Sequence, residues 1–362
     1  MQVIRVTKQE EGQRLDRYLG KYLSQAPMSF FYKMLRKKNI TLNGKKAAGK
    51  EKLQEGDEIT FFLSDDTIQK FRGVENIGQR ADNRTASSGQ PTVKKQKDTS
   101  PERKKQKDTV TSGQQITLDV VYEDEEILVI NKPVGMLSQK AGKEDISLVE
   151  YVTDYLMTRE EQNNTTFRPG ICNRLDRNTT GLIVAGKTIK SLQYMNRLFR
   201  ERALQKYYLC LVKGRVAESA YIDGYLKKDE KHNRVTVTRQ EQPGAVRIVT
   251  AYEPLSVAGW KGEEYTLLKV HLITGKSHQI RAHLKSIGHP IVGDTKYGEK
   301  SLYHLFKKEF GVRYQLLHAW KLCLDAADYL PEKYHGKVFT APLPECFYRV
   351  IQELGLTTEE EK

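Results

Sequence analysis

The sequence contains little cysteine and no long apolar run. Its four cysteines among 362 residues lie far apart and form no C-x-x-C pair, which argues against a disulfide framework and against a zinc site. No stretch approaches the roughly 20 apolar residues that a transmembrane helix needs. The opening segment MQVIRVTKQEEGQ lacks the apolar core of a signal peptide. We therefore expect a cytoplasmic protein without a membrane partner.

Positive charge is in excess instead. The formal net charge is +14 and the isoelectric point is about 9.3, which predicts an anionic partner such as nucleic acid or anionic lipid. Charge alone is also compatible with a cationic surface that only keeps the protein soluble. The length allows two or three domains, at roughly 100–200 residues each.

Residues 1–63 form the first of three segments that differ in composition. In RLDRYLGKYL the apolar residues from Leu15 to Leu23 recur at the spacing of one helix face. A second helix is predicted after Pro27, in SFFYKMLRKKN. Its buried side is predicted to consist of Phe30 or Phe31, Met34 and Leu35.

A hairpin completes this segment. The pair Asn43-Gly44 in ITLNGKK predicts a two-residue turn, and EGDEITFFL predicts a strand. Two short helices and a hairpin resemble the S4 RNA-binding module, including the LNGK turn and the EGDEI entry to the last strand. The resemblance implies RNA binding, whereas the alternative is a small core whose basic residues only face water. The residues implied in RNA contact are Arg14, Lys33, Arg36, Lys37 and Lys38.

The second segment, residues 64–115, is rich in Lys, Gln, Ser and Thr and has almost nothing to form a core. The unit KKQKDT occurs twice, at residues 94–99 and 104–109. So polar a repeat cannot stack as a solenoid. We predict a disordered basic linker, which either holds the first segment near RNA or acts only as a tether.

The third segment, residues 116–362, alternates β-rich runs with helical ones. VVYEDEEILVINKP, YYLCLVKG and YTLLKVHLIT are predicted strands, and SLQYMNRLFRERAL is a predicted helix with Leu192, Met195, Leu198 and Phe199 on one face. Strands dominate and helices are scattered. This favours an α+β domain with a mixed, largely antiparallel sheet over a regular βαβ array.

The segment GLIVAGKT, residues 181–188, matches the phosphate-loop pattern G-x-x-x-x-G-K-[ST]. Its intervening residues are apolar or β-branched, which is typical of a buried strand rather than of a flexible loop around phosphates. The best candidate for the companion strand, EILVIN, ends in Asn131 and Lys132, without the carboxylate that would hold magnesium. We therefore predict a core strand and no nucleotide cofactor.

Asp176 directly precedes this strand and lies between Arg174 and Arg177. Arginine neighbours lower the pKa of a carboxylate and hold it ionised. An ionised, poorly solvated carboxylate can serve as a nucleophile or a base. From the local pattern alone, a structural ion pair at the start of a strand is an equal alternative.

The segment RLDRNTTGLIVAGKT resembles the active-site motif of the RluA family of pseudouridine synthases, H-R-L-D-R-x-T-S-G-L. KYYLCLVKG and LITGKSHQIRAHLKSIGHPIVGDTKYG resemble two further motifs of that family in the same order, and VINKPVGMLSQ and LLHAWKL resemble its opening and closing strands. Together they cover essentially all of residues 116–350, and an N-terminal S4 module is a common companion. The chain departs from the pattern at Asn173 for His, Asn178 for an acidic or variable residue, Thr180 for Ser and Lys276 for Arg.

The resemblance implies isomerisation of uridine to pseudouridine in RNA, a reaction that requires no cofactor and no metal. It implies that Asp176 is the essential carboxylate, which attacks C1′ or C6 or removes a ribose proton. Arg281 is the implied ion-pair partner of Asp176. Tyr208 is implied to stack on the extruded uracil and to help remove the C5 proton, and Arg174 to fill the gap that the base leaves. Further implied substrate contacts are Leu175, Arg177, Thr180, Gly181, His278, Gln279 and Ile280.

Relatives that carry an S4 module act mostly on large-subunit ribosomal RNA. The resemblance therefore implies 23S ribosomal RNA as the substrate, with transfer RNA as the alternative. A protein of another class, a non-catalytic RNA-binding or ribosome-assembly factor with the same fold, is the main competing hypothesis. A monomer is expected to be sufficient for the activity.

Overall fold

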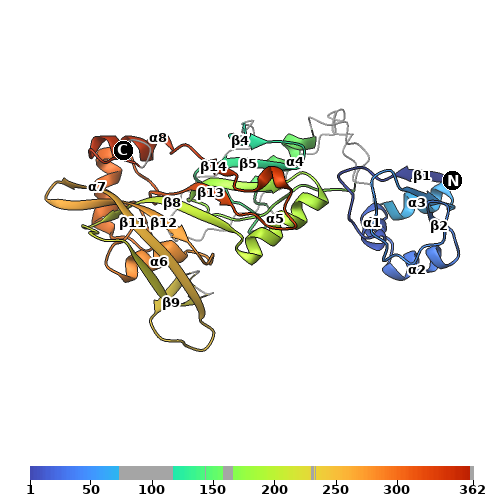
Figure 1. The fold of residues 1–362 in the computed structure, drawn as a ribbon, viewed down its shortest axis with the longest axis horizontal. Helices are drawn as coiled ribbons and strands as arrows, with labels where there is room; N and C mark the ends of the chain where they lie inside the picture. The colour runs from blue at the N-terminus through green and yellow to red at the C-terminus, as the bar shows by residue number, and fades with distance from the viewer. Residues whose placement is uncertain (73–116, 143, 158–165, 230–231, 233, 359–362) are drawn as a thin grey trace, which may run out of the picture.

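A computed structural model describes residues 1–72, 117–142, 144–157, 166–229, 232 and 234–358. Within these ranges the chain forms two parts with separate sheets and separate apolar cores (Figure 1). From residue 73 on, the predicted linker lies outside the described residues. None of the described helices is both long and apolar enough to cross a membrane.

The N-terminal part is a small α+β unit in which helices and an antiparallel three-stranded sheet share one core. Both predicted helices and the hairpin turn are confirmed. Asn43 and Gly44 have φ angles of +50° and +70°, and Leu42 and Lys45 exchange backbone hydrogen bonds of 3.0 and 2.9 Å. Its elements are β1 (Gln2–Arg5), α1 (Leu15–Tyr22), α2 (Met28–Arg36), β2 (Ile40–Leu42), β3 (Glu58–Phe61) and α3 (Asp65–Arg72).

Helix α3 corrects the predicted boundary of the linker. The segment 65–72 was expected to contribute nothing to a core, yet Ile68 is buried and the ring of Phe71 lies 4.8 Å from that of Phe30. Two apolar residues three positions apart suffice for one helix to cover a core that already exists. In α2 it is Phe31 that is fully buried, and Phe30 is half-buried beneath α3.

The larger part is built on an eleven-stranded sheet in the order β10-β9-β11-β12-β8-β13-β7-β5-β4, with β14 beside β13 and β6 beside β7. Only β13 and β7 run parallel among the described strand pairs, so the prediction of a mixed, largely antiparallel sheet is confirmed. Its strands are β4 (Val120–Glu123), β5 (Ile127–Lys132), β6 (Gly170–Ile171), β7 (Thr180–Gly186), β8 (Leu204–Lys213), β9 (Ala220–Asp229), β10 (Arg234–Thr238), β11 (Val246–Trp260), β12 (Glu263–Leu272), β13 (Leu317–Leu324) and β14 (Val338–Thr340).

Helices cover both faces of this sheet. On one face α4 and α6 share an apolar cluster with β5, β7, β8 and β12, and on the other face α7 and α8 pack against β8, β12 and β13. A third cluster joins α5 to β5 and β7. The helices are α4 (Leu148–Met157), α5 (Ile189–Glu201), α6 (Gln279–Ser286), α7 (Lys300–Phe310) and α8 (Glu345–Glu353), with a short 3-10 helix at Glu332–Tyr334.

Residues 181–186 of the segment that matches the phosphate-loop pattern lie in strand β7, and every residue of the strand is buried. Thr188, at the end of the pattern, is the N-cap of α5. Gly181 is required there by geometry rather than by a ligand. Its φ is +109°, and a Cβ at this position would lie 2.2 Å from the carbonyl oxygen of Ala319 on the parallel strand β13. The prediction of a core strand is confirmed.

The two parts touch through residues 7–12. The backbone N–H and the hydroxyl of Thr166 donate to Glu10 Oε1 at 2.7 and 2.9 Å, and the backbone N–H of Ile189 donates to the carbonyl oxygen of Gln9 at 3.0 Å. Glu10 is 1% exposed, so these hydrogen bonds are shielded from water. Figure 1 accordingly shows the N-terminal part at one end of the molecule, next to α5.

Candidate active site

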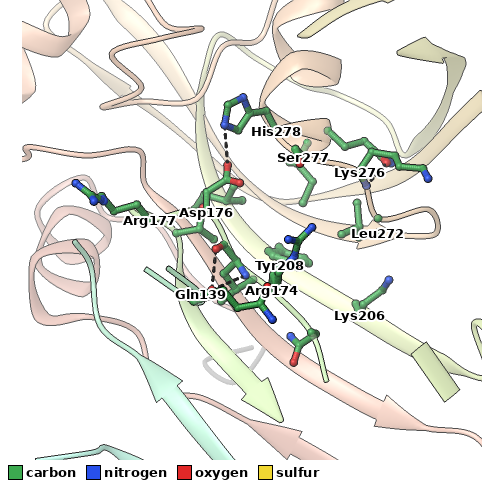
Figure 2. A pocket seen from close by; sticks show the side chains of 18 of the residues that line it. Gln139, Arg174, Asp176, Arg177, Lys206, Tyr208, Leu272, Lys276, Ser277 and His278 are labelled. Atoms are coloured by element: carbon green, nitrogen blue, oxygen red, sulfur yellow. Dashed lines mark hydrogen bonds and ion pairs between the residues drawn. The ribbon is translucent and has the colours of Figure 1, made fainter. Parts of the chain in front are cut away.

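A cavity of ≈ 670 Å³ lies where the loop before β7 meets the start of α6. Its walls come from residues 137–141, the loop 172–179, the end of α5, the start of β8 and the turn 275–278. Figure 2 shows Asp176 and His278 on one side of this cavity, with Lys206 and Leu272 on the other. Segments far apart in the chain therefore meet around one carboxylate.

The loop that carries Asp176 is attached to β7 by Asn173. The Asn173 amide donates to the carbonyl oxygen of Leu182 at 3.0 Å, and its oxygen accepts from the backbone N–H of Val184 at 2.9 Å. The residue that replaces the usual histidine of the motif thus binds backbone of the neighbouring strand. Its contribution is to fix where the loop begins.

Two further side chains clamp the residues on either side of Asp176. The Ser138 hydroxyl donates to the carbonyl oxygen of Leu175 at 2.9 Å and accepts from its N–H at 3.0 Å. The ammonium of Lys132, fully buried, donates to the carbonyl oxygen of Arg177 at 3.0 Å. Burial lowers the pKa of Lys132 and the charge of Asp176 partly offsets this, so that the resulting pKa is about 7. The backbone around Asp176 is therefore held rigidly.

Arg281 connects Asp176 to a second, fully buried carboxylate. Its Nη1 donates to Asp176 Oδ2 at 3.0 Å, while Nε and Nη2 donate to the two oxygens of Asp294 at 2.7 and 2.9 Å. Asp294 also accepts the backbone N–H groups of Lys296 and Tyr297 at 2.8 and 2.9 Å. Burial alone would raise the pKa of Asp294, but the hydrogen bonds from Arg281 lower it below its usual range. Asp294 holds the guanidinium, and the guanidinium aims Asp176.

His278 approaches Asp176 from the other side. Its Nε2 lies 3.8 Å from Asp176 Oδ2, and its Nδ1 lies 2.9 Å from the hydroxyl of Tyr297, which accepts the N–H of Val235 (Figure 2). Burial lowers the pKa of His278 and the charge of Asp176 raises it, with a net shift downward. At neutral pH the imidazole beside the carboxylate is therefore uncharged.

The cavity has apolar walls next to Asp176. Tyr208 on β8, Ile280 on α6, and Leu272 and Leu317 at the strand ends all line it and are nearly buried. Burial raises the pKa of Tyr208, and the charge of Asp176 raises it further, so this phenol is protonated at neutral pH. A planar ring would find apolar contacts here within reach of the Asp176 carboxylate.

Cations surround the mouth of the cavity. Arg174 and Arg177 line it and are exposed. Lys276 lines it too, a position noted from the sequence only as a departure from the family motif. Four further basic residues of this rim had no signal in the sequence, because they lie on elements whose relative placement no local pattern reveals. They are Lys140, Arg200, Arg202 and Lys206.

Thr180 and Gly181 do not line the cavity, contrary to the expectation that they contact substrate. Both belong to buried strand β7. The Thr180 hydroxyl lies 2.8 Å from Nδ1 of the buried His318 on β13. Both residues therefore join β7 to β13.

Gln279 lines the cavity, but its amide is used inside the protein. The residue is 2% exposed, and both ends of the amide are hydrogen-bonded. It thereby ties the start of α6 to β11 and to the turn before the helix. Its partners are Thr274, the N–H of Lys276, the carbonyl oxygen of Val249 and the hydroxyl of Thr250, at 2.9 to 3.1 Å.

The basic residues singled out in the N-terminal part lie on its surface. Arg14 precedes α1 and forms an ion pair with Asp16, which also accepts the hydroxyl of Tyr32. The remaining four are exposed at the end of α2 and just after it, where they form a basic edge. They are Lys33, Arg36, Lys37 and Lys38.

Comparison with known proteins identifies the family of this chain. The family model described as RNA pseudouridylate synthase matches residues 126–286, which include Asp176, Tyr208 and Arg281. An uncharacterized RNA pseudouridine synthase of Mycoplasma genitalium is 30% identical over 319 residues, covering 88% of this chain and 87% of that protein. The chain belongs to the RNA pseudouridine synthase family. It is an enzyme, an isomerase of uridine in RNA.

Other relatives of this synthase have names that state a substrate. The ribosomal large subunit pseudouridine synthase C of Vibrio vulnificus is 26% identical over 355 residues, covering 98% of this chain and 96% of that protein. The corresponding synthase D of Nitrosomonas europaea is 32% identical over 243 residues, covering 66% of each chain. The structure of human RNA Pseudouridylate Synthase Domain Containing 4 matches 66% of this chain at 22% identity with a TM-score of 0.53, which shows the same fold.

Three residues that shape the site of this synthase had no assigned role in the sequence analysis: Lys132, Ser138 and Asp294. The position of Lys132 at the end of the apolar run EILVIN could have indicated a structural role, because a cation that follows a buried strand needs hydrogen-bond acceptors nearby. Asp294 stands in the quoted motif GHPIVGD, but nothing local indicates that it binds Arg281. The pairing became visible only in three dimensions.

Proposed function

We propose that this synthase isomerises specific uridines of large-subunit ribosomal RNA, in the cytoplasm and as a monomer. The observation that carries the proposal is the carboxylate of Asp176, held by Arg281 at the wall of a cavity beside Tyr208. Relatives named ribosomal large subunit pseudouridine synthase C and D, aligned over most of their length, support the choice of RNA.

The chemistry begins at Asp176. In the reaction the bond between ribose C1′ and uracil N1 breaks, the base turns, a bond forms between C1′ and C5, and the C5 proton is lost while N1 gains one. Atoms balance without any co-reactant. The carboxylate of Asp176 starts this sequence by attack at C1′ or C6, or by removal of a ribose proton. Arg281 holds this carboxylate in position through its hydrogen bond to Oδ2.

The base must leave the RNA stack before it reaches this cavity, at a cost of a few kcal/mol. Tyr208 and Ile280 are placed to sandwich the uracil. The phenol of Tyr208 is protonated at neutral pH, so it can help to remove the C5 proton only if it passes its own proton on at the same time. Arg174 is exposed at the rim, where its planar guanidinium can stack in the gap that the base leaves. Leu175 and Arg177 flank the carboxylate and complete the contact with the nucleotide.

The N-terminal part, of S4 type in this proposal, supplies RNA affinity through the basic edge of α2. Phosphate contacts by Lys33, Arg36, Lys37 and Lys38 make binding fall steeply with salt. The hydrogen bonds of Glu10 keep this part next to the catalytic one. Removing residues 1–72 is expected to weaken RNA binding more than it lowers turnover at saturating RNA.

The test is tritium release from RNA labelled at uridine C5, with the wild type, Asp176→Ala and Asp176→Asn. Large-subunit ribosomal RNA, its precursor particles and transfer RNA are supplied separately, and RNA affinity is measured for each variant. We expect release from the ribosomal RNA by the wild type only, with affinity retained in both variants. Release from transfer RNA alone would show that transfer RNA, and not ribosomal RNA, is the substrate. Release that persists in both variants would show that the reaction does not need Asp176.

A further inference from the structure

Lys206 occupies the cavity on the same strand face as Tyr208. In β8 (Leu204–Lys213) side chains alternate, so residues 206 and 208 point to one side, while Tyr207 on the other side stacks against His271 with ring centroids 4.9 Å apart. Lys206 Nζ lies over the turn after β12, 3.5 Å from where a Cβ of Gly275 would be. Figure 2 shows Lys206 apart from Asp176, with Tyr208 between the two.

This ammonium is half-buried without a counter-charge. Within the described part of the chain, no carboxylate or other acceptor is paired with Lys206, and its pKa is lowered by burial first and by the neighbouring charge of Arg202 second. Burying a cation without a partner is unfavourable. A site that holds two adjacent cations in this state is suited to an anion that arrives with the substrate.

Arg202 reaches the cavity because of how α5 ends. It is the C-cap residue, with φ +60°, and its N–H donates to the carbonyl oxygen of Leu198. Glycine is the usual residue in this left-handed conformation, and an arginine there carries strain. Arg202 is exposed at the cavity wall, where its charge acts on the ammonium of Lys206.

We propose that Lys206 and Arg202 together bind one phosphate of the RNA backbone, next to the nucleotide whose base enters the cavity. A compact ammonium and a planar guanidinium fork are the pair of groups that phosphate oxygens accept best. The phosphate supplies the counter-charge that Lys206 lacks and fixes the strand on the side of Tyr208 opposite Asp176. This inference rests on the proposed function only in taking RNA as the substrate.

The experiment compares Lys206→Met and Lys206→Arg with the wild type. Lys308→Met is the matched control, because Lys308 is an exposed lysine on α7, away from the cavity. The dissociation constant for RNA is measured between 50 and about 300 mM salt, and kcat and KM are measured by tritium release. Loss of one phosphate contact should raise Kd and KM about tenfold and reduce the slope of log Kd against log salt by about 0.7 to 0.9.

We expect kcat to stay within about twofold of the wild type, Lys206→Arg to restore binding, and Lys308→Met to change nothing. Should Lys206→Met lower kcat and leave Kd and the salt slope unchanged, the lysine would act in the chemistry and the phosphate site would be refuted. Equal behaviour of Lys206→Met and Lys308→Met would also refute it. If Lys206→Met does not fold, Arg202→Met takes its place, since Arg202 is exposed.

The outcome is separable from the choice of RNA. Binding and its salt dependence are measured on large-subunit ribosomal RNA and on transfer RNA alike. A wild type that modifies only transfer RNA would overturn the proposed substrate, and the phosphate site would then be judged on that RNA.

Discussion

Replacement of Asp294 by asparagine tests whether a buried carboxylate holds the active-site arginine. Asp294 is 1% exposed. Its carboxylate accepts four hydrogen bonds, two from Arg281 and two from backbone N–H groups. Asp294→Asn preserves the shape. The asparagine oxygen can keep part of these bonds, but its NH₂ group would face the donors of Arg281. The guanidinium then retains Asp176 as its only carboxylate.

The expected loss of stability follows from burial. Breaking a buried ion pair costs about 3–5 kcal/mol, and we take about 3 kcal/mol for this shape-preserving change. A domain of this size shifts its melting temperature by about 2–4 °C per kcal/mol, so Asp294→Asn should lower Tm by about 6–12 °C. The folded-state pKa of Asp294 lies below its unfolded value, so this contribution is present above about pH 4 and disappears as the pH falls further.

Asp223 provides a matched control. It forms the same forked pair with Arg247, at 3.1 and 2.6 Å, but on the exposed surface of β9. Water and salt screen such a pair, so Asp223→Asn should leave Tm unchanged. Thermal unfolding is followed by calorimetry at pH 7, and tritium release is measured well below both midpoints. We expect at least a tenfold loss of kcat for Asp294→Asn alone; equal Tm shifts in both variants would refute the reasoning.

Three further predictions concern the frame of the site. Lys132→Met leaves buried carbonyl oxygens without a hydrogen-bond donor, at a cost of about 1–3 kcal/mol each. Denaturant unfolding should therefore show a large loss of stability, and tritium release should show a lower kcat. A variant as stable as the wild type would contradict this. Gly181→Ala places a Cβ 2.2 Å from backbone at φ +109° and should cost about 2–5 kcal/mol, clearly more than Gly244→Ala, where φ is +77° and space is open. Burial lowers the pKa of His283 and His318 to about 4 from 6.5, so the unfolded state binds more protons below pH 6.5 and stability falls as the pH drops toward 4. At pH 5 each histidine should cost about 2 kcal/mol relative to pH 7, Tm should fall accordingly, and His318→Gln should flatten the curve; a Tm equal at both pH values would rule this out.

The elements with strong periodicity were predictable from the sequence. The apolar run of β7 could be separated from a phosphate loop because an exposed loop cannot tolerate Leu182, Ile183 and Val184 side by side. The spacing in α5 likewise identified the face that Met195 and Leu198 bury. These patterns depend only on residues that are close in the sequence, so they can be recognised without knowing the tertiary structure.

The contacts that make the site are not local. Arg281 is 105 residues from Asp176, and its second carboxylate, Asp294, is a further 13 residues away. No spacing rule links these positions, and only the resemblance to a family indicated the first pair. Strand β1 and helix α3 were missed for a related reason. Each is short, and each is stabilised by a core that the rest of the N-terminal part provides.

The motif RLDRNTTGL combines two functions that its letters do not separate. Asp176 and its neighbours face the cavity, where the loop is held by Ser138 and Lys132. Four residues later the chain has entered β7, and Thr180 and Gly181 join this strand to β13 through His318 and a close backbone contact. The two halves depend on each other, because the parallel pairing of β7 with β13 sets where the loop emerges, and the loop sets where Asp176 meets Arg281. The motif around Asp176 therefore spans two structural roles: its first half carries the carboxylate at the cavity, and its second half fixes where that carboxylate lies.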